Sequence, residues 1–129
     1  MNHPQVELCL GIHRAYASLR LQLDEELGTY HGIDFDDFAL LHALAGAGAE
    51  PASLERLAAA LGTSRSALLR RVRPLEKTGL VSCDGSVAGR RITLRAPGHA
   101  LVGIAGDTVV RVCARPLLVE GIRSASAAR

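Results

Sequence analysis

The sequence of 129 residues predicts a mainly α-helical domain that contains a helix-turn-helix and a two-stranded β-hairpin. Three observations lead to this fold class. Apolar residues recur at spacings of three and four, the period of amphipathic helices. A turn signal at Gly62 separates two short helical patterns, as in a helix-turn-helix. Asp84-Gly85 lies between two short runs typical of strands, which predicts a hairpin.

The first half of the chain predicts three helices. The longest covers residues 4–28, and its apolar stripe consists of Ile12, Tyr16, Leu19, Leu23 and Leu27. The second covers residues 35–45, with Asp34 as its N-cap. A loop of Gly, Ala and Pro ends it, and a third helix over residues 54–61 begins after Ser53.

The second half predicts a fourth helix, the hairpin and a last helix. Thr63 or Ser64 caps the fourth helix, which runs to Thr78, and Pro74 inside it predicts a kink or an early break. The strands are expected at residues 80–83 and 90–94. The last helix opens at Pro97, breaks near Pro116 and resumes weakly towards Ile122.

Composition is that of one globular domain with a single core. No apolar run is long enough to span a membrane, and the first residues lack a secretory pattern, so a cytoplasmic protein is expected. The three cysteines are an odd number without close pair spacing. They predict neither a disulfide framework nor a zinc site, and no cofactor is expected.

Positive charge is concentrated in one third of the chain. Residues 1–62 carry three basic and nine acidic side chains, whereas residues 63–95 carry eight basic and two acidic ones. Seven of those eight are arginines, which favour bidentate contacts with phosphate or guanine. A polyanion is the expected partner of such a segment.

The helix-turn-helix accounts for this charge. A helical wheel of the fourth helix places Leu68, Val72 and Leu75 on one side, facing the core. The basic and polar residues spread over the opposite side, and residues 63–67 lie at the end that reaches base edges. The candidate contacts with double-stranded DNA are Thr63, Ser64, Arg65, Ser66, Ala67, Arg70, Arg73, Lys77, Arg90 and Arg91.

These residues resemble a known family. The run Leu-Ala-Ala-Ala-Leu-Gly-Thr-Ser at 57–64, with Leu68, Arg70, Val72, Leu75-Glu76 and Gly79-Leu80-Val81, is similar to the MarR family of bacterial transcription regulators. The resemblance implies a winged helix-turn-helix over residues 34–95 and dimerisation helices at residues 1–30 and 97–124. It also implies a homodimer on a pseudo-palindromic operator, acting as a repressor that a small phenolic or other aromatic effector relieves.

Two departures from the family pattern concern the wing and the C-terminal region. The hairpin tip, residues 84–89, contains no Arg for the minor groove, so Arg90 or Arg91 is expected to serve from its base. Since alternate strand residues face opposite ways, only one of the two is expected to do so. The C-terminal region is short, and burial of Val109, Val112, Leu117 and Leu118 against a partner is the hypothesis for what holds the dimer.

Candidate sensor residues fall into two groups. His13, His31 and His42 are candidates for lining an effector crevice, although helical histidines more often make ordinary polar contacts. Cys9 and Cys113 resemble the peroxidatic and resolving thiols of the peroxide-sensing branch of the family. That branch offers tyrosines on the second helix, where this chain has Phe35 and Phe38, so burial as small hydrophobes is the favoured reading.

Enzymatic activity is not expected. The sequence has no His-Glu-x-x-His, no phosphate-binding glycine loop and no Gly-x-Ser-x-Gly, and its acids lack histidines at metal-binding spacing. The alternative to DNA binding is a winged helix that serves as a protein-interaction module. The two alternatives differ in the salt dependence of binding, which is steep for DNA because counterions are released.

Overall fold

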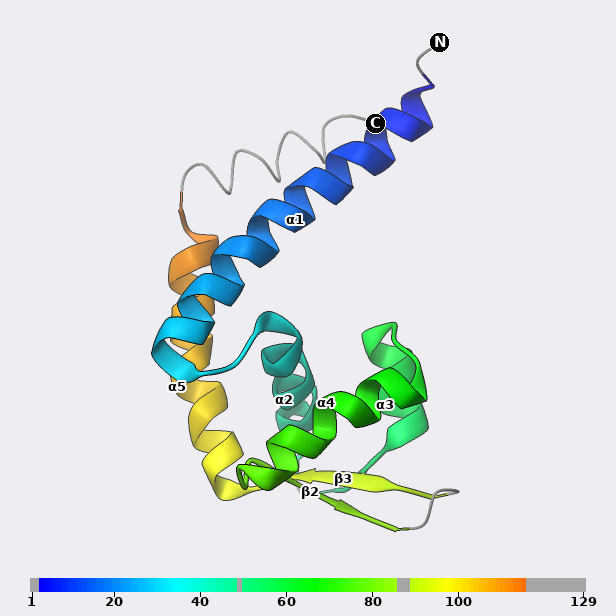
Figure 1. The fold of residues 1–129 in the computed structure, drawn as a ribbon, viewed down its shortest axis with the longest axis vertical. Coiled ribbons are helices and arrows are strands. Elements are labelled where there is room, and N and C mark those ends of the chain that lie inside the picture. Colours follow the sequence, from blue (N-terminus) through cyan, green and yellow to red (C-terminus); the bar gives the residue numbers. More distant parts are fainter. Residues whose placement is uncertain (1–2, 49, 86–88, 116–129) are drawn as a thin grey trace. The chain divides into compact units, whose positions relative to one another are not determined.

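The computed structural model describes residues 3–48, 50–85 and 89–115, which form five helices and three strands (Figure 1). They divide into two compact units. Of the described residues, 3–35 and 106–115 form the terminal unit, and 36–48, 50–85 and 89–105 form the central unit. No helix within the described ranges has the length and apolar character that spanning a membrane requires.

The terminal unit contains α1 (Pro4–His31) and the second part of α5 (Ala96–Cys113). Leu23 and Leu27 of α1 and Val112 of α5 are fully buried. At the end of α1, His31 Nε2 lies 2.7 Å from the hydroxyl of the buried Thr108, and Arg115 is paired with Glu26. Polar contacts therefore join the two helices around a small apolar core.

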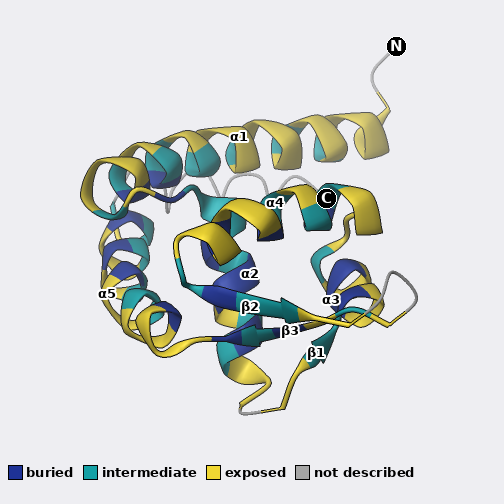
Figure 2. Cartoon of the chain, turned by 60° about the horizontal axis from the view of Figure 1, so that its bottom comes forward, coloured by how far each residue is buried: buried dark blue, intermediate teal, exposed yellow. Residues whose placement is uncertain are grey.

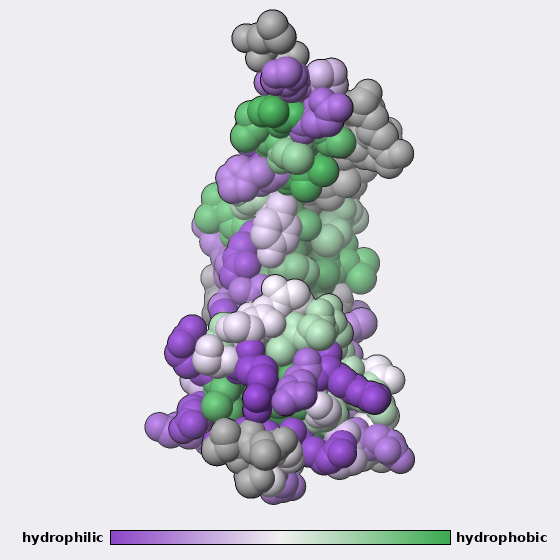
Figure 3. Space-filling model, turned by 90° about the vertical axis from the view of Figure 1, so that its right-hand side faces the viewer, coloured by the Kyte–Doolittle hydropathy of each residue, from purple (hydrophilic) through white to green (hydrophobic). Residues whose placement is uncertain are grey.

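The apolar stripe of α1 is buried over only part of its length. Leu23 and Leu27 have no exposed surface, whereas the side chains of Ile12 and Tyr16 on the same stripe are 53% and 44% exposed. Figure 3 shows apolar surface over the N-terminal part of this helix. The N-terminal half of α1 thus presents an apolar face to solvent.

The central unit is a helix-turn-helix with a small antiparallel sheet. It contains α2 (Phe35–Gly46) from Asp36 onwards, β1 (Ala52–Ser53), α3 (Leu54–Leu61), α4 (Arg65–Lys77), β2 (Val81–Asp84), β3 (Arg91–Leu94) and the start of α5. The strand order is β1-β3-β2, with Ala52 opposite Ile92 and Val81 opposite Leu94. The core combines Val81, Ile92 and Leu94 of the sheet with buried residues of α2, α3 and α4.

The fold class and the helix order expected from the sequence are confirmed, with two differences in detail. A short strand, β1, adds a third member to the sheet. Pro74 does not end α4, and because Pro74 is exposed, water can solvate the carbonyl of Arg70 that loses its helical donor. The resumed helix expected over residues 117–122 lies outside the described residues.

Gly98, in the first turn of α5, lies directly against Leu80 and against Leu94 of β3. The residue is buried, and a Cβ atom there would overlap the carbonyl oxygen of Leu80 and the side chain of Leu94. A glycine at position 98 is therefore required for α5 to begin directly after β3.

We expect Gly98→Ala to lower the free energy of unfolding by about 1–3 kcal/mol, because the added methyl group overpacks this contact. Urea unfolding at a fixed protein concentration measures the change. Gly46→Ala is the matched control, since a Cβ at Gly46 meets nothing within 4 Å. Equal stability of the two variants would show that α5 does not approach the sheet in this way.

Candidate nucleic-acid interface

One side of α4 is anchored in the core of the central unit. Leu68, Val72 and Leu75 are at most 5% exposed, as the sequence predicted. Ser64 is the N-cap, and its hydroxyl accepts a hydrogen bond of 3.1 Å from the backbone N–H of Ala67. The start, tilt and rotation of the helix are therefore fixed by packing and by its cap.

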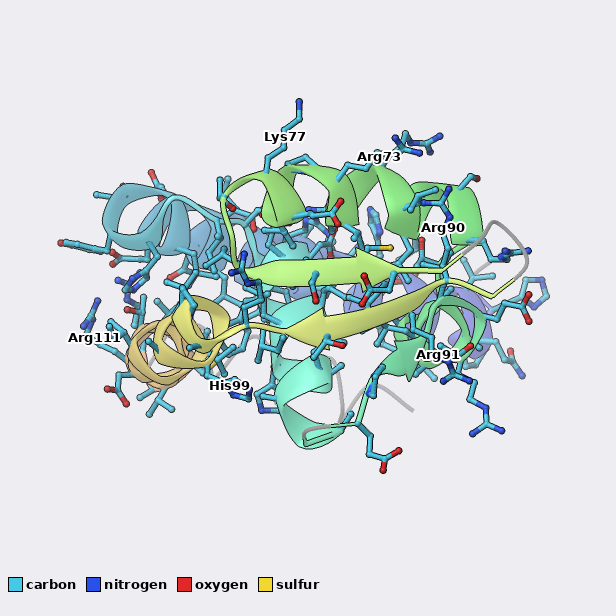
Figure 4. All side chains as sticks on the ribbon, turned by 90° about the horizontal axis from the view of Figure 1, so that it is seen from below. Arg73, Lys77, Arg90, Arg91, His99 and Arg111 are labelled. Carbon is cyan, nitrogen blue, oxygen red and sulfur yellow. The ribbon has the colours of Figure 1, made fainter. Side chains whose placement is uncertain are left out.

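The other side of α4 faces solvent and is polar. Ser66, Arg70, Arg73 and Lys77 are all exposed. At 100° per residue their side chains project within a sector of about 60°, so they form a single strip along the helix. Figure 2 shows this face of α4 as exposed, and in Figure 4 Arg73 and Lys77 extend away from the protein. We call these four residues the outer strip.

The helix-turn-helix presents the N-terminus of α4 at the protein surface. Gly62 joins α3 to the turn at a φ of 68°, a conformation that favours glycine. Ala58 is buried, which agrees with its expected role at the close crossing of the two helices. Thr63 and Ser64 are exposed and Ala67 is half-buried, so the predicted base-reading residues are accessible at this end.

Arg65 lies on the flank of α4 and not on the outer strip. Its Nη1 is 3.4 Å from Oε1 of Glu55, and the side chains of the two residues are 47% and 64% exposed. The expectation that Arg65 shares the face opposite the leucines is therefore corrected. Its guanidinium lies near α3, because residue 65 is about 100° around the helix from Ser66.

The wing is the hairpin of β2 and β3. Arg90 lies on the side of the sheet where Arg73 and Lys77 extend, whereas Arg91 points to the opposite side (Figure 4). The backbone carbonyl of Arg90 accepts a hydrogen bond of 3.1 Å from the N–H of Leu54, the first residue of α3. This bond connects the base of the wing to the helix-turn-helix.

A hollow of about 180 Å³ lies between the wing and the helix-turn-helix. It combines the start of α3, the start of α4 and the base of the wing. Its lining residues are Ser53, Leu54, Glu55, Arg65, Gly89, Arg90 and Arg91. Three arginines and a single carboxylate meet there, so the hollow is predominantly positive.

Arg71 belongs to α4 but has a structural role. Its Nη1 donates a hydrogen bond of 2.9 Å to Oδ1 of Asp37, and its Nη2 lies 3.4 Å from Oδ2 of Asp36. Both carboxylates belong to the first turn of α2. Arg71 therefore ties α4 to α2, and one of the eight basic residues of segment 63–95 is used inside the central unit.

The sensor candidates do not converge on a site within either unit. His31 is hydrogen-bonded to Thr108, and His42 is exposed with its ring 5.7 Å from that of the buried Phe38. His13 is exposed. No group of metal-ligating side chains occurs in the described part of the chain.

One expectation about burial in the dimer region is wrong, namely that for Val112. Cys9 is exposed and Cys113 is half-buried within the single chain, so the burial of both as small hydrophobes in a dimer stays a prediction. Val112 is already fully buried within its own chain, so it has no surface left for a partner to cover. Val109 is half-buried, and Leu117 and Leu118 lie outside the described residues.

The sequence analysis missed two residues that act on α4. Glu55 was counted only among the nine acidic side chains of residues 1–62, and its pairing with Arg65 depends on the crossing of two helices. The inward position of Arg71 was detectable, because a helical wheel places it beside Leu75. Its partners Asp36 and Asp37 are more than thirty residues away in sequence and follow only from the tertiary structure.

Comparison with known proteins supports the assignment of these elements. Residues 38–84 match a family of helix-turn-helix domains. No curated protein sequence shows significant similarity to the chain. Solved structures, by contrast, include many similar folds.

Three of these structures illustrate the similarity. A MarR-family protein of Mycobacterium tuberculosis, solved with p-aminosalicylic acid, is 29% identical (TM-score 0.65, 82% of this chain and 80% of that one). A MarR-family regulator of Streptomyces coelicolor, solved with DNA, is 26% identical (TM-score 0.64, coverage 88% and 68%). The regulator BldR of Sulfolobus solfataricus is 22% identical (TM-score 0.74, coverage 93% and 92%).

Adjacent arginines of α4 provide a test of this geometry. We expect Arg71→Ala to lower the free energy of unfolding by about 1–2 kcal/mol, since Asp36 and Asp37 lose a shared cation that is only partly exposed. Arg70→Ala should change it by less than about 0.5 kcal/mol, because Arg70 is exposed. Denaturant unfolding of both variants measures the two changes in free energy of unfolding. A larger loss for Arg70→Ala would contradict the assigned inward and outward faces.

Proposed function

This chain has the fold of the MarR family of transcription regulators, as the resemblance in its sequence predicted, and we propose that it is a sequence-specific DNA-binding regulator. It acts in this proposal as a homodimer on a pseudo-palindromic operator. Each α4 enters a major groove and each wing lies along the neighbouring backbone or minor groove. Binding within a promoter excludes the transcription machinery, so the protein is a repressor.

The outer strip of α4 carries the proposal. It places three cations and a hydroxyl on one exposed side of a helix whose other side is buried. A helix held in this manner offers a major groove both phosphate contacts and hydrogen-bond donors for base edges. Arg90, on the same side of the sheet, extends this surface to the wing.

The apolar face of α1 supports the homodimer. Ile12 and Tyr16 continue a stripe that is buried further along the helix, yet both are exposed. An exposed apolar surface of this kind is typical of an interaction site. A second copy of the chain would bury it, and the dimer must present its two α4 helices about one helical turn, ~34 Å, apart to contact both half-sites.

The proposal also includes regulation: a small aromatic acid binds the protein and releases it from the operator. The relative from Mycobacterium tuberculosis was solved with p-aminosalicylic acid, and it is 29% identical to this chain. An effector that binds the DNA-free form more tightly shifts the equilibrium away from the operator. His13, His31 and His42 stay candidates for contact with such a ligand.

DNA binding is tested with the duplex upstream of the protein's own gene. We expect Arg70→Ala and Arg73→Ala each to weaken binding by about 1–3 kcal/mol if the side chain reads a base, and to flatten the salt dependence if it contacts phosphate. Mobility shifts between 50 and 200 mM salt measure both quantities. Glu25→Gln, at an exposed position of α1, serves as a control.

Two results would overturn the proposal. Unchanged affinity and salt slope in both arginine variants would remove the outer strip from the interface. A weak salt dependence of the parent protein, together with binding to another protein, would indicate the interaction module instead.

The dimer is tested at the N-terminal half of α1. We expect Ile12→Glu to shift the protein to the monomer in sedimentation at micromolar concentration, because a buried, unpaired carboxylate is strongly unfavourable at an apolar interface. Ser18→Glu is the matched control, since Ser18 is exposed and lies well away from the apolar stripe on the helical wheel. A parent protein that sediments as a monomer would contradict the homodimer.

A further inference from the structure

We propose that Glu55 is a specificity-determining residue, which competes with the DNA backbone for the guanidinium of Arg65. This inference rests on the proposed DNA binding. It concerns the hollow lined by Glu55, Arg65, Arg90 and Arg91, in which Glu55 is the only carboxylate among the lining residues.

The position of Glu55 is well defined by the backbone around it. It is the second residue of α3, whose N-cap Ser53 accepts a hydrogen bond from the N–H of Arg56. The preceding residue, Leu54, donates its N–H to the carbonyl of Arg90 in the wing. The start of α3 is therefore fixed against the wing, and the Glu55 carboxylate projects from a fixed point.

Arg65 is the first residue of α4, where a recognition helix meets base edges. Its Nη1 lies 3.4 Å from Glu55. A guanidinium carries five N–H donors, which are enough to contact a carboxylate and the O6 and N7 acceptors of a guanine together. Glu55 and a base can thus be bound by Arg65 at the same time.

A backbone phosphate competes with Glu55 for the same guanidinium. Carboxylate and phosphate oxygens both suit the planar donor fork of arginine, so Arg65 has to leave Glu55 in order to pair fully with a phosphate. The Glu55 carboxylate would then face the phosphates without its own cation. Both side chains are largely exposed, and such ion pairs are weak enough to exchange.

This competition affects binding to non-specific DNA and binding to the operator differently. Non-specific binding depends on phosphate contacts, so Glu55 opposes it wherever the protein lies on the duplex. On the operator, Arg65 gains base contacts while it keeps Glu55 as a partner. Glu55 therefore lowers affinity for non-specific DNA more than affinity for the operator.

The test compares the parent protein, Glu55→Gln and the isosteric control Glu25→Gln, whose side chain is exposed on α1. Fluorescence anisotropy measures binding to the upstream duplex and to a scrambled duplex of equal length, between 50 and 200 mM salt. We expect Glu55→Gln to bind the scrambled duplex about three- to tenfold more tightly. Its salt slope should steepen by about 0.9, the value for one additional phosphate.

Arg65→Ala separates this role from a merely structural one. In the Arg65→Ala background, Glu55→Gln should no longer increase the affinity for scrambled DNA, because the competing guanidinium is absent. Circular dichroism verifies that each variant is folded.

The inference is overturned if Glu55→Gln changes operator and scrambled binding by the same factor, matches Glu25→Gln, or has the same effect without Arg65. A parent protein that binds neither duplex would refute the proposed function itself. That outcome is distinct from the failure of Glu55 to discriminate between the two duplexes.

Discussion

Burial of Leu68, Val72 and Leu75 is the constraint on which the rest of the structure depends. Each fully buried side chain of this size contributes about 1.5–3 kcal/mol, and together they determine which side of α4 faces inward. Ser66, Arg70, Arg73 and Lys77 are therefore directed outward by the same packing that stabilises the domain. In this account, function depends on which side of α4 faces outward, and packing in the core determines that side.

Polar contacts refine the position that the core sets. Ser64 fixes where α4 begins, and Arg71 ties its middle to Asp36 and Asp37 of α2. The start of α3 is joined to the wing through Leu54 and the carbonyl of Arg90. These contacts connect α4 to α2 and α3 to the wing, so the exposed arginines project from a connected framework.

Patterns local in sequence predicted most of this fold. Apolar periodicity predicted the helices, Ser53 and Ser64 were predicted as N-caps, and Asp84-Gly85 predicted the hairpin. The sequence did not predict the two-residue strand β1, which depends on pairing with the distant Arg91 and Ile92. Nor did it predict the partners of Arg65 and Arg71, because long-range ion pairs depend on how the helices pack.

The central claim is that the outer strip of α4, and not its inner side, meets the DNA. The most direct measurement follows the side-chain Nε–H signals of the arginines by nuclear magnetic resonance while duplex DNA is added. The account predicts that the signals of Arg70 and Arg73 shift, whereas that of Arg71, held by Asp37, stays in place. Unchanged signals of Arg70 and Arg73 in a protein saturated with DNA would contradict it.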